Sequence, residues 1–302
     1  MNFTTVTPTL VKSGLDKIID ISGKQSPAVW RNYVMGDISS NGQKYVKIES
    51  FSGVGLQVAM NEGATHPVDA METPYDMEVT PQQYGLAIIL TELAIDTDYY
   101  GKLKEAGMSL AQSRKDTESA VAANVLNLGF TAPGSGGPKT LDNVAFFSAS
   151  HTAATGTQSN LNTSLALSQA NLETAVAAAR RRYNHRGVVR QYLGPLKLIV
   201  PPALEYLALR LTNSALIPGS ANNDKNVLQG MQVIVDPFLT STTSWFLGAS
   251  NPANTAIHRI QGAVGDYSHA EKIYDPRIVK YTNGAMYAFC VGDWRGMHGC
   301  QA

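Results

Sequence analysis

The residues that could carry out chemistry are few and dispersed along the chain. Its two cysteines, Cys290 and Cys300, form neither a CxxC pair nor a disulfide framework. The histidines are scattered without the spacing of metal ligands: His66, His151, His185, His258, His269 and His298. Histidines distributed in this way are usually surface or loop residues, so we expect no metal site.

Motifs for catalysis and for phosphate binding are also incomplete. The segment Gly53-Val54-Gly55 lacks the third glycine of a dinucleotide-binding loop, and GSGGPKT at residues 134–140 places Pro138 where a phosphate loop needs glycine. Neither GxSxG nor HExxH occurs in the sequence. Asp96 and Asp98 are paired carboxylates, but two acids without a pocket do not indicate acid–base catalysis. We therefore expect no catalytic residue, no cofactor and no enzyme, with an α/β enzyme as a distant alternative.

The overall composition favours self-association. The 302 residues contain 24 basic and 24 acidic side chains, and charged residues make up only 16% of the chain. A typical soluble domain has roughly 25% charged residues, and a neutral, charge-poor surface promotes association. The zero net charge excludes a dedicated nucleic-acid binder. The longest strongly apolar run, Leu86–Leu90, is far too short to span a membrane.

Charge is unevenly divided between two parts of the chain. Residues 1–101 carry 6 basic and 12 acidic side chains, and the remaining 201 residues carry 18 and 12. No lysine or arginine lies between Lys47 and Lys102, which also excludes a self-catalysed isopeptide bond from this segment. An acidic projection and a basic body on one chain are complementary, and such contacts between copies are head-to-tail. The alternative is that both are solvated faces of one monomer.

The first half of the chain predicts an arm, a hairpin and a long helix. In the first 40 residues only Leu15–Ile21 is typical of a helix, so this part is expected to be an arm that packs against something else. Residues 44–51 and 74–90 have extended patterns around the glycine-containing residues 53–73, which predicts a long β-hairpin with a broad tip. A helix is expected over residues 98–128, capped by Asp98 and ended by Gly129.

The second half predicts a compact α+β module. Ser168 is a candidate N-cap for a helix that carries Leu172, Val176, Ala179 and Tyr183 on one face. Strands are expected at residues 144–147, 196–200, 231–235, 243–247 and 278–291. Pro201 and Pro202 open a further helix, and a polar loop follows at residues 217–227.

Several local strings, taken in order, resemble the major capsid (head) proteins of tailed bacteriophages. They are LIVPPALEYLA at residues 198–208, NVLQG at 226–230, VIVDPF at 233–238, WFL at 245–247, Thr91, Glu92 and Asp96, FFSASH at 146–151, and DWRG at 293–296. The Mu-type head subunits are the branch that the chain resembles most. The matching strings cover most of the chain from about residue 42 onward.

The resemblance implies an α+β tailed-phage major capsid fold with four parts. Residues 1–41 would form the N-terminal arm and residues 42–96 the extended loop. Residues 97–159 and 273–302 would form the peripheral domain, with a spine helix at 98–128, and residues 160–272 the axial domain. The stretch before the hairpin is expected to be too short for a scaffolding segment.

The resemblance also implies a function and partners. The chain would assemble with itself into homo-hexamers and homo-pentamers of an icosahedral head that encloses double-stranded DNA, which it would contact without reading sequence. Portal and scaffolding or decoration proteins are further expected partners, with assembly in the host cytoplasm and no membrane partner. An encapsulin-type nanocompartment shell is the alternative within the same architecture.

Three groups of residues are expected at contacts between copies. The acidic group lies in the extended loop, and the basic group would face it from a neighbouring copy; a third group would line the capsomer centre. These groups are, in that order, Glu62, Asp69, Glu72 and Asp76; Lys102, Lys104, Arg114 and Arg181; and Asn222, Asn223, Asp224 and Lys225.

Overall fold

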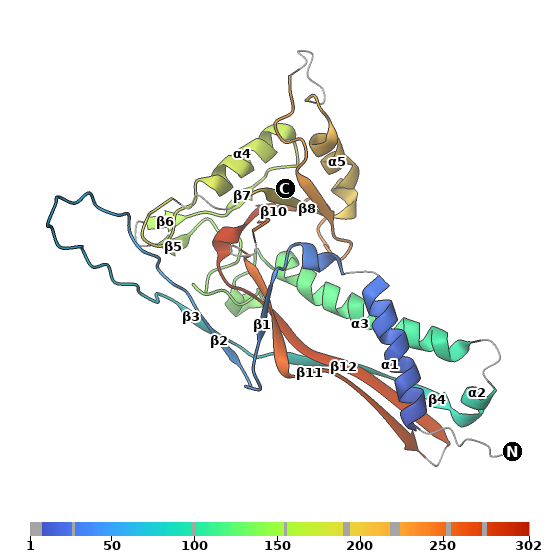
Figure 1. Cartoon of the computed structure of the whole chain (residues 1–302). Helices are drawn as coiled ribbons and strands as arrows, with labels where there is room; N and C mark the ends of the chain where they lie inside the picture. Colours follow the sequence, from blue (N-terminus) through green and yellow to red (C-terminus); the bar gives the residue numbers. More distant parts are fainter. Residues whose placement is uncertain are drawn as a thin grey trace.

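A four-stranded sheet and a five-stranded sheet, each covered by its own helices, make up the body of the molecule, and a long loop projects from it (Figure 1). The computed structural model describes residues 8–25, 28–97, 101–153, 156–189, 194–217, 224–251, 255–273 and 277–301. The α-helices are α1 (Pro8–Gln25), α2 (Glu92–Asp96), α3 (Lys102–Asn127), α4 (Gln169–Arg180) and α5 (Glu205–Asn213). Short 3-10 turns lie at Val29–Asn32, Pro133–Ser135, Pro202–Leu204 and Trp294–Gly296.

The four-stranded sheet has the order β1-β11-β12-β4 and forms the elongated limb of the molecule. Its strands are β1 (Gly36–Ser39), β11 (Ile257–Ile273), β12 (Ile278–Val291) and β4 (Gln82–Thr91). Helices α1 and α3 pack on one face of this sheet, where Leu15, Leu110, Val279 and Tyr281 are buried together. Gly107 lets the two helices approach, because a Cβ atom at this position would lie 2.8 Å from Leu15 Cδ2.

The five-stranded sheet has the order β7-β13-β10-β8-β9. Its strands are β7 (Leu161–Thr163), β13 (Met297–Gln301), β10 (Trp245–Ala249), β8 (Leu196–Val200) and β9 (Gln232–Val235). Helices α4 and α5 cover one face, and Leu172 and Ala208 are buried there against Leu198 and Trp245. The opposite face, including Phe246, joins a core that also contains residues from α3 and from the 3-10 turn at 29–32. The two sheets therefore share one core.

Two short ribbons complete the strands: β2 (Val46–Glu49) with β3 (Asp76–Val79), and β5 (His151–Ala153) with β6 (Gly156–Gln158). The predicted hairpin is thus only partly a β structure, since β2 and β3 pair over four residues and the chain between them forms no strand. Pro81, which cannot donate a backbone hydrogen bond, separates β3 from β4. Strand β4 then pairs with β12 and not with β2.

The sequence located several elements closely. The predicted strands at 196–200 and 278–291 coincide with β8 and β12, and the helix predicted over 98–128 is α3, at Lys102–Asn127. Ser168 caps α4 by accepting a hydrogen bond from the Asn171 N–H. Tyr183 lies beyond the end of α4, and Asp98 lies outside the described residues.

Other predictions were wrong. Helix α1 is much longer than the predicted Leu15–Ile21. Residues 144–147 form no strand, because the backbone of this segment bonds to loops: the Phe147 N–H donates to Gly129 O, and Phe146 O accepts from the Asn160 amide. Strand β11 was not predicted; residues 262–265 interrupt its pairing with β12.

The predicted division into domains differs from the sheet pairing at two strands. Residues 257–272 were placed in the axial part, whereas β11 pairs with β12 along the limb. Residues 297–301 were placed in the peripheral part, whereas β13 pairs with β10 in the five-stranded sheet. We therefore keep the division into domains as a proposal, with β11 moved to the peripheral part and β13 moved to the axial part.

A buried arginine ties the end of α4 to β13. Arg182 Nη1 donates to the carbonyls of Arg295 (2.5 Å) and Met297 (2.8 Å), and Nη2 lies 2.6 Å from His298 Nδ1. Because guanidinium can only donate, Nδ1 of His298 is the acceptor and the ring proton lies on Nε2. Burial, and then the charge of Arg182, lowers the pKa of His298 to about 3.

This pKa predicts acid sensitivity. A histidine in the unfolded chain binds a proton below about pH 6.5, whereas folded His298 does not until about pH 3. His298 therefore stabilises the unfolded chain progressively as the pH falls through this interval. We expect His298→Asn, which keeps an acceptor for Arg182, to lose less stability than the wild type between pH 7 and pH 4. Urea unfolding at both pH values measures this, and an equal loss in the two proteins would contradict it.

Candidate self-association interface

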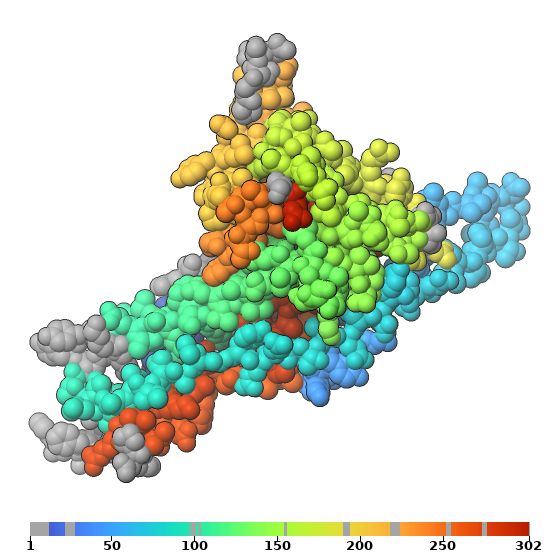
Figure 2. Space-filling model, turned by 180° about the vertical axis from the view of Figure 1, so that it is seen from behind, coloured from blue at the N-terminus to red at the C-terminus, as the bar shows by residue number. Residues whose placement is uncertain are grey.

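Within the predicted extended loop at residues 42–96, residues 50–75 project away from the body as a finger (Figure 2), and the name extended loop is used for these residues in the description of the structure. Two pairs of hydrogen-bonding residues continue the β2–β3 ribbon at its base: the Ser50 N–H donates to Tyr75 O and the Ser52 N–H to Glu72 O, both at 2.9 Å. Beyond this base the two arms of the loop separate. The segment therefore extends from its own subunit with little support from secondary structure.

The extended loop carries apolar side chains that no core covers. On the outgoing arm they stand at every second position from 54 to 60, and Leu56 is 78% exposed; on the return arm Val68 is 97% exposed. All of the exposed apolar residues of the loop are Phe51, Val54, Leu56, Val58, Met60, Val68 and Met71. A cluster of exposed apolar side chains on one projection is typical of a surface that another protein covers.

The arms of the loop enclose a hollow of about 610 Å³. Its lining is mostly apolar and includes Val54, Leu56, Met60 and Val68, with His66 and Asp69 as the titratable members. Apolar side chains that line a hollow open to water lack the van der Waals contacts of a packed core, and they do not gain the free energy of burial. The loop thus offers a binding surface that one copy of the chain leaves unfilled.

The loop is held at its base by a short hairpin, residues 183–189, that follows α4. Arg186 forms an ion pair with the Asp69 carboxylate, and its Nη2 donates to Ala70 O at 3.1 Å. The other Asp69 oxygen accepts from the Gly55 N–H at 2.8 Å, so this carboxylate also joins the two arms. The hydrogen bond from Gly55 and, next, the Arg186 guanidinium hold the pKa of Asp69 below its usual value. The Asp69–Arg186 pair therefore fixes the direction in which the loop leaves the body.

The ring of His185 strengthens the same base. It packs edge-on against Tyr75, with 5.9 Å between ring centroids. Burial and the nearby Arg295 charge lower the pKa of His185, and Glu72 opposes them. An imidazole that is neutral near pH 7 suits this partly apolar position.

The predicted acidic residues occupy different environments. Glu62 is exposed in the turn at the tip, and Glu72 is exposed near the base. Asp76 lies on β3 and pairs with Lys47 at 3.0 Å, and Asp69 pairs with Arg186. Asp69 and Asp76 thus have partners within their own chain, which leaves Glu62 and Glu72 as the carboxylates best placed to face a second copy.

The predicted basic residues do not gather at one point. Lys104 is exposed near the start of α3, whereas Arg181 is exposed at the end of α4, which covers the five-stranded sheet. Arg114 is partly buried and pairs with Asp266 of β11 at 2.5 Å. Lys102 begins α3, but its side chain lies outside the described residues. Arg114 is therefore engaged within its own subunit.

Two members of the predicted capsomer-centre group, Asp224 and Lys225, lie on the projecting segment that follows α5. Asp224 and Lys225 are exposed there, and the Ile217 N–H donates to Asp224 O at 2.9 Å. Leu216 and Lys225 form an isolated bridge that brings the two sides of the tip together. Asn222 and Asn223 lie outside the described residues.

Buried polar groups elsewhere bond to one another within the fold. The His151 ring lies 2.6 Å from Asp142 through Nδ1 and 3.1 Å from Asn160 Oδ1 through Nε2, and it stacks on Trp294. His151 is fully buried, and the Asp142 side chain is nearly so. Within the described residues no cluster of three or more His, Cys, Asp or Glu side chains is placed to hold a metal ion. None of the helices among the described residues could cross a membrane.

The sequence analysis missed the apolar residues of the loop and the role of Arg186. Alternation at 54, 56, 58 and 60 was visible, but the glycines around it suggested a mobile tip. The signal that could have revealed this surface is the alternation of apolar residues in a segment that is too irregular to form part of the core. Arg186 could not be identified, because its contact with Asp69 spans 117 positions in the sequence.

Comparison with known proteins identifies the fold. A family model described as phage capsid protein matches residues 74–298. The capsid of cyanophage P-SCSP1u is similar, with 10% identity and a TM-score of 0.56 over 91% of this chain and 88% of that chain. The capsid of Ralstonia phage GP4 has 12% identity and a TM-score of 0.55 over 87% and 84% of the two chains.

An encapsulin shares the fold. The SrpI encapsulin of Synechococcus elongatus PCC 7942 has 8% identity and a TM-score of 0.53, and the match covers 92% of this chain and 88% of that chain. No curated protein sequence matches the chain. The structural neighbours confirm the predicted mixed capsid fold.

The loop base gives a first prediction for this surface. Arg186→Gln removes the charge that holds Asp69, and we expect faster amide hydrogen exchange across residues 53–70 with little change in the body. Arg181→Gln is the matched control, because it removes an exposed arginine five positions away. Equal exchange in the two variants would show that the Asp69–Arg186 pair does not position the loop.

The apolar surface gives a second prediction. The triple variant Val54→Ser, Leu56→Ser and Val58→Ser should fold with an unchanged melting temperature, because these side chains are exposed in the single copy. Its self-association should be lost, since fully burying each of these side chains contributes roughly 1.5–3 kcal/mol. Sedimentation velocity measures the association, and a triple variant that associates like the wild type would contradict a role for this surface.

Proposed function

Because this chain belongs to the phage capsid protein family, whose model matches residues 74–298, we propose that its copies assemble head-to-tail into hexamers and pentamers of an icosahedral shell. The chain is a major capsid protein and a component of a virion. The observation that carries the head-to-tail arrangement is the extended loop, whose apolar side chains are exposed in the single copy. The proposed role of the loop is to lie across the α3 limb of a neighbouring copy.

Charge supports this direction of contact. The segment between Lys47 and Lys102 has no basic residue, whereas residues 102–302 carry six more basic than acidic side chains. Glu62 and Glu72 on the loop would face Lys104 on the limb of the next copy and Arg181 near its loop base. Pairs of this kind at an interface determine register and partner choice more than they add to affinity. Apolar burial would provide most of the stability of the shell.

The four predicted parts of the chain fit this arrangement. Residues 1–41 would be the N-terminal arm, 42–96 the extended loop, 97–159 with 273–302 the peripheral domain, and 160–272 the axial domain, with β11 and β13 exchanged as described above. Asp224 and Lys225 would then lie at the capsomer centre. Within the family, we keep the Mu-type head subunits as the proposed branch.

The proposed contents of the shell are double-stranded DNA, held without sequence recognition through a minority of basic residues on the inner surface. Portal and scaffolding or decoration proteins are proposed partners, and the host cytoplasm is the proposed place of assembly. The family is one of shell proteins, and we propose that the chain catalyses no reaction.

A nanocompartment that encloses protein cargo is the second candidate, because an encapsulin shares the fold. The match to the phage capsid protein family favours a phage head over a nanocompartment. The contents of purified particles distinguish the two: nuclease-protected DNA in particles from a producing host supports the phage head, and a co-purified enzyme with no DNA supports the nanocompartment.

Assembly itself is the direct test of the proposed function. The purified chain should sediment as capsomers or larger particles, and negative-stain electron microscopy should reveal rings or closed shells. A chain that remains monomeric at all concentrations and salt conditions, with or without its scaffolding partner, would contradict the proposal.

The charge arrangement predicts a rescue. Glu62→Lys combined with Glu72→Lys should leave the monomer folded but reduce assembly at low salt, where charge repulsion is least screened. Adding Lys104→Glu and Arg181→Glu to the same chain should restore particles, because the reversed charges again attract. Light scattering during assembly measures both effects. Failure of the four-residue variant to recover would argue against pairing between these groups.

A further inference from the structure

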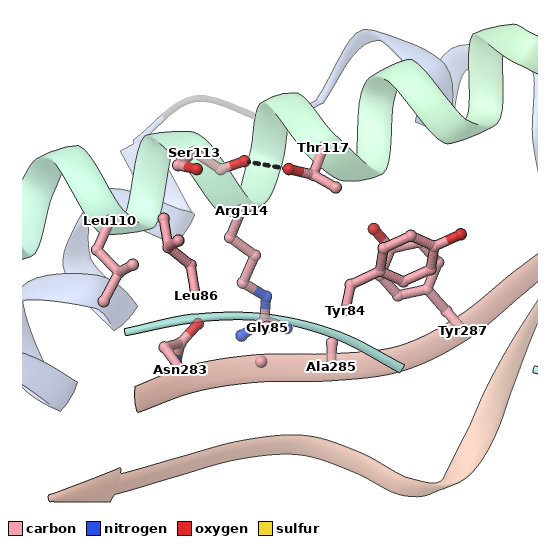
Figure 3. Close-up of a pocket in the computed structure, with 11 residues that line it drawn as sticks. Tyr84, Gly85, Leu86, Leu110, Ser113, Arg114, Thr117, Asn283, Ala285 and Tyr287 are labelled. Carbon is pink, nitrogen blue, oxygen red and sulfur yellow. Dashed lines mark hydrogen bonds between the residues drawn. The ribbon is translucent and has the colours of Figure 1, made fainter. Parts of the chain in front are cut away.

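A recess of about 200 Å³ lies between α3 and the β4–β12 pair, far from the extended loop of the same chain (Figures 1 and 3). Its roof is formed by Leu110, Ser113 and Thr117 of α3. Its floor includes Gly85 and Gly284, which are direct partners across the two strands. The Tyr84 and Tyr287 rings stack at one end, with 4.6 Å between centroids.

The recess is kept open by residues that are committed elsewhere. Arg114 descends from α3 toward Gly85 (Figure 3) and pairs with Asp266 of β11. Tyr267 covers the opposite side of the glycine pair, because a Cβ atom on Gly284 would lie 2.4 Å from its Oη. The Gln83 amide donates to the same oxygen at 2.8 Å. Neither Tyr267 nor Arg114 is therefore free to fill the recess.

The size of the recess suits one branched aliphatic side chain, and its lining combines apolar residues with the polar Ser113, Arg114, Thr117 and Asn283. An apolar cavity of about 150 Å³ can hold a benzene molecule, so a volume somewhat larger accommodates a leucine side chain. Leu86 and Leu110 provide apolar walls. Burial raises the pKa of the Tyr84 hydroxyl, which is consistent with a poorly hydrated site.

Apolar residues continue from the recess along the outer strand. Strand β4 is the edge of its sheet, and Leu86, Ile89 and Leu93 are exposed on β4 and at the start of α2. The sequence of α3 is also basic here, since residues 102–115 contain three lysines and one arginine against one glutamate, and Lys104 is exposed. A partner for this surface should be extended, apolar and acidic.

The extended loop has those three properties. Its outgoing arm alternates apolar side chains, it carries the exposed carboxylates Glu62 and Glu72, and its segment of sequence has no basic residue. Leu56 is the most exposed apolar residue on that arm. Since the loop projects away from the limb that α3 and β4 form (Figure 1), the loop must come from another copy.

We propose that the recess between α3 and β4 receives the Leu56 side chain of a second copy of this chain, with the neighbouring Val54 and Val58 of that copy beside Leu86, which lies on the recess face of β4. The inference rests on the proposed head-to-tail assembly and assigns its contact to named residues. The contact is heterologous, so repetition of it closes a ring when the rotation between copies is suitable.

Disulfide trapping tests this contact in assembled protein. The double variant Leu56→Cys/Ser113→Cys should give a ladder of covalent oligomers on non-reducing gels after mild oxidation. Each single variant should not give this ladder. The native Cys290 and Cys300 are buried and do not compete. The matched control is Leu56→Cys/Ala177→Cys, which places the second thiol at an exposed position on α4.

The outcomes distinguish failure of the recess contact from failure of shell assembly. Shells of the double variant that lack a Leu56–Ser113 ladder, or an equal ladder from the Ala177 control, would overturn the recess and leave shell assembly intact. Absence of particles from the wild type would overturn both. The variant Ser113→Phe adds a second readout, because it fills the recess and should reduce assembly at least tenfold while the monomer melts normally. Normal assembly of this variant would also overturn the proposal.

Discussion

The apolar side chains of the extended loop cannot be buried by the chain that carries them. The contacts that tie the loop to its own subunit include the Asp69–Arg186 pair, the hydrogen bond from Arg186 to Ala70 O and the packing of His185 on Tyr75, and they lie toward its base. Beyond that base Leu56 and Val68 are almost fully exposed. Burial of these groups is favourable and non-directional, so it needs a second surface that is held in a fixed position. The loop base holds the apolar side chains in position, and the rigid limb provides the second surface.

The limb can act as such a surface because its own core is complete. Leu15 of α1 and Leu110 of α3 are buried against Tyr281 of β12, and the Tyr281 hydroxyl donates to Asp16 at 2.6 Å. Arg259 of β11 pairs with Glu118 of α3 at 2.7 Å in a nearly buried position. The limb is thus fixed to its helices by both apolar and polar contacts. Leu86 and Ile89 remain exposed on the outer strand β4, where a neighbour can reach them.

Periodicity alone predicted the elements whose apolar residues face a single core. Strand β8 and helices α4 and α5 belong to this group, because Leu198, Leu172 and Ala208 occupy regular positions in one core. Residues 144–147 were assigned to a strand because Phe146 and Phe147 are apolar, yet both are anchored by loop contacts. Strand β11 was missed because Gly262 and Gly265 interrupt its pattern and its burial does not alternate regularly along the strand.

The candidate interface was predictable in charge but not in contacts. The acidic segment and the basic body follow from the sequence, whereas the pairing of Asp69 with Arg186 and of Arg114 with Asp266 depends on the fold. Three residues expected to face a neighbour, Asp69, Asp76 and Arg114, are therefore paired within their own chain, and the apolar residues of the loop take the larger role.

A cryo-electron microscopy map of the assembled shell at side-chain resolution tests the central claim most directly. The account predicts that residues 54–60 of each copy lie against the α3–β4 limb of the adjacent copy, with the Asp69–Arg186 pair retained within the subunit. A shell in which these residues stay exposed to solvent, or fold back onto their own subunit, would contradict it.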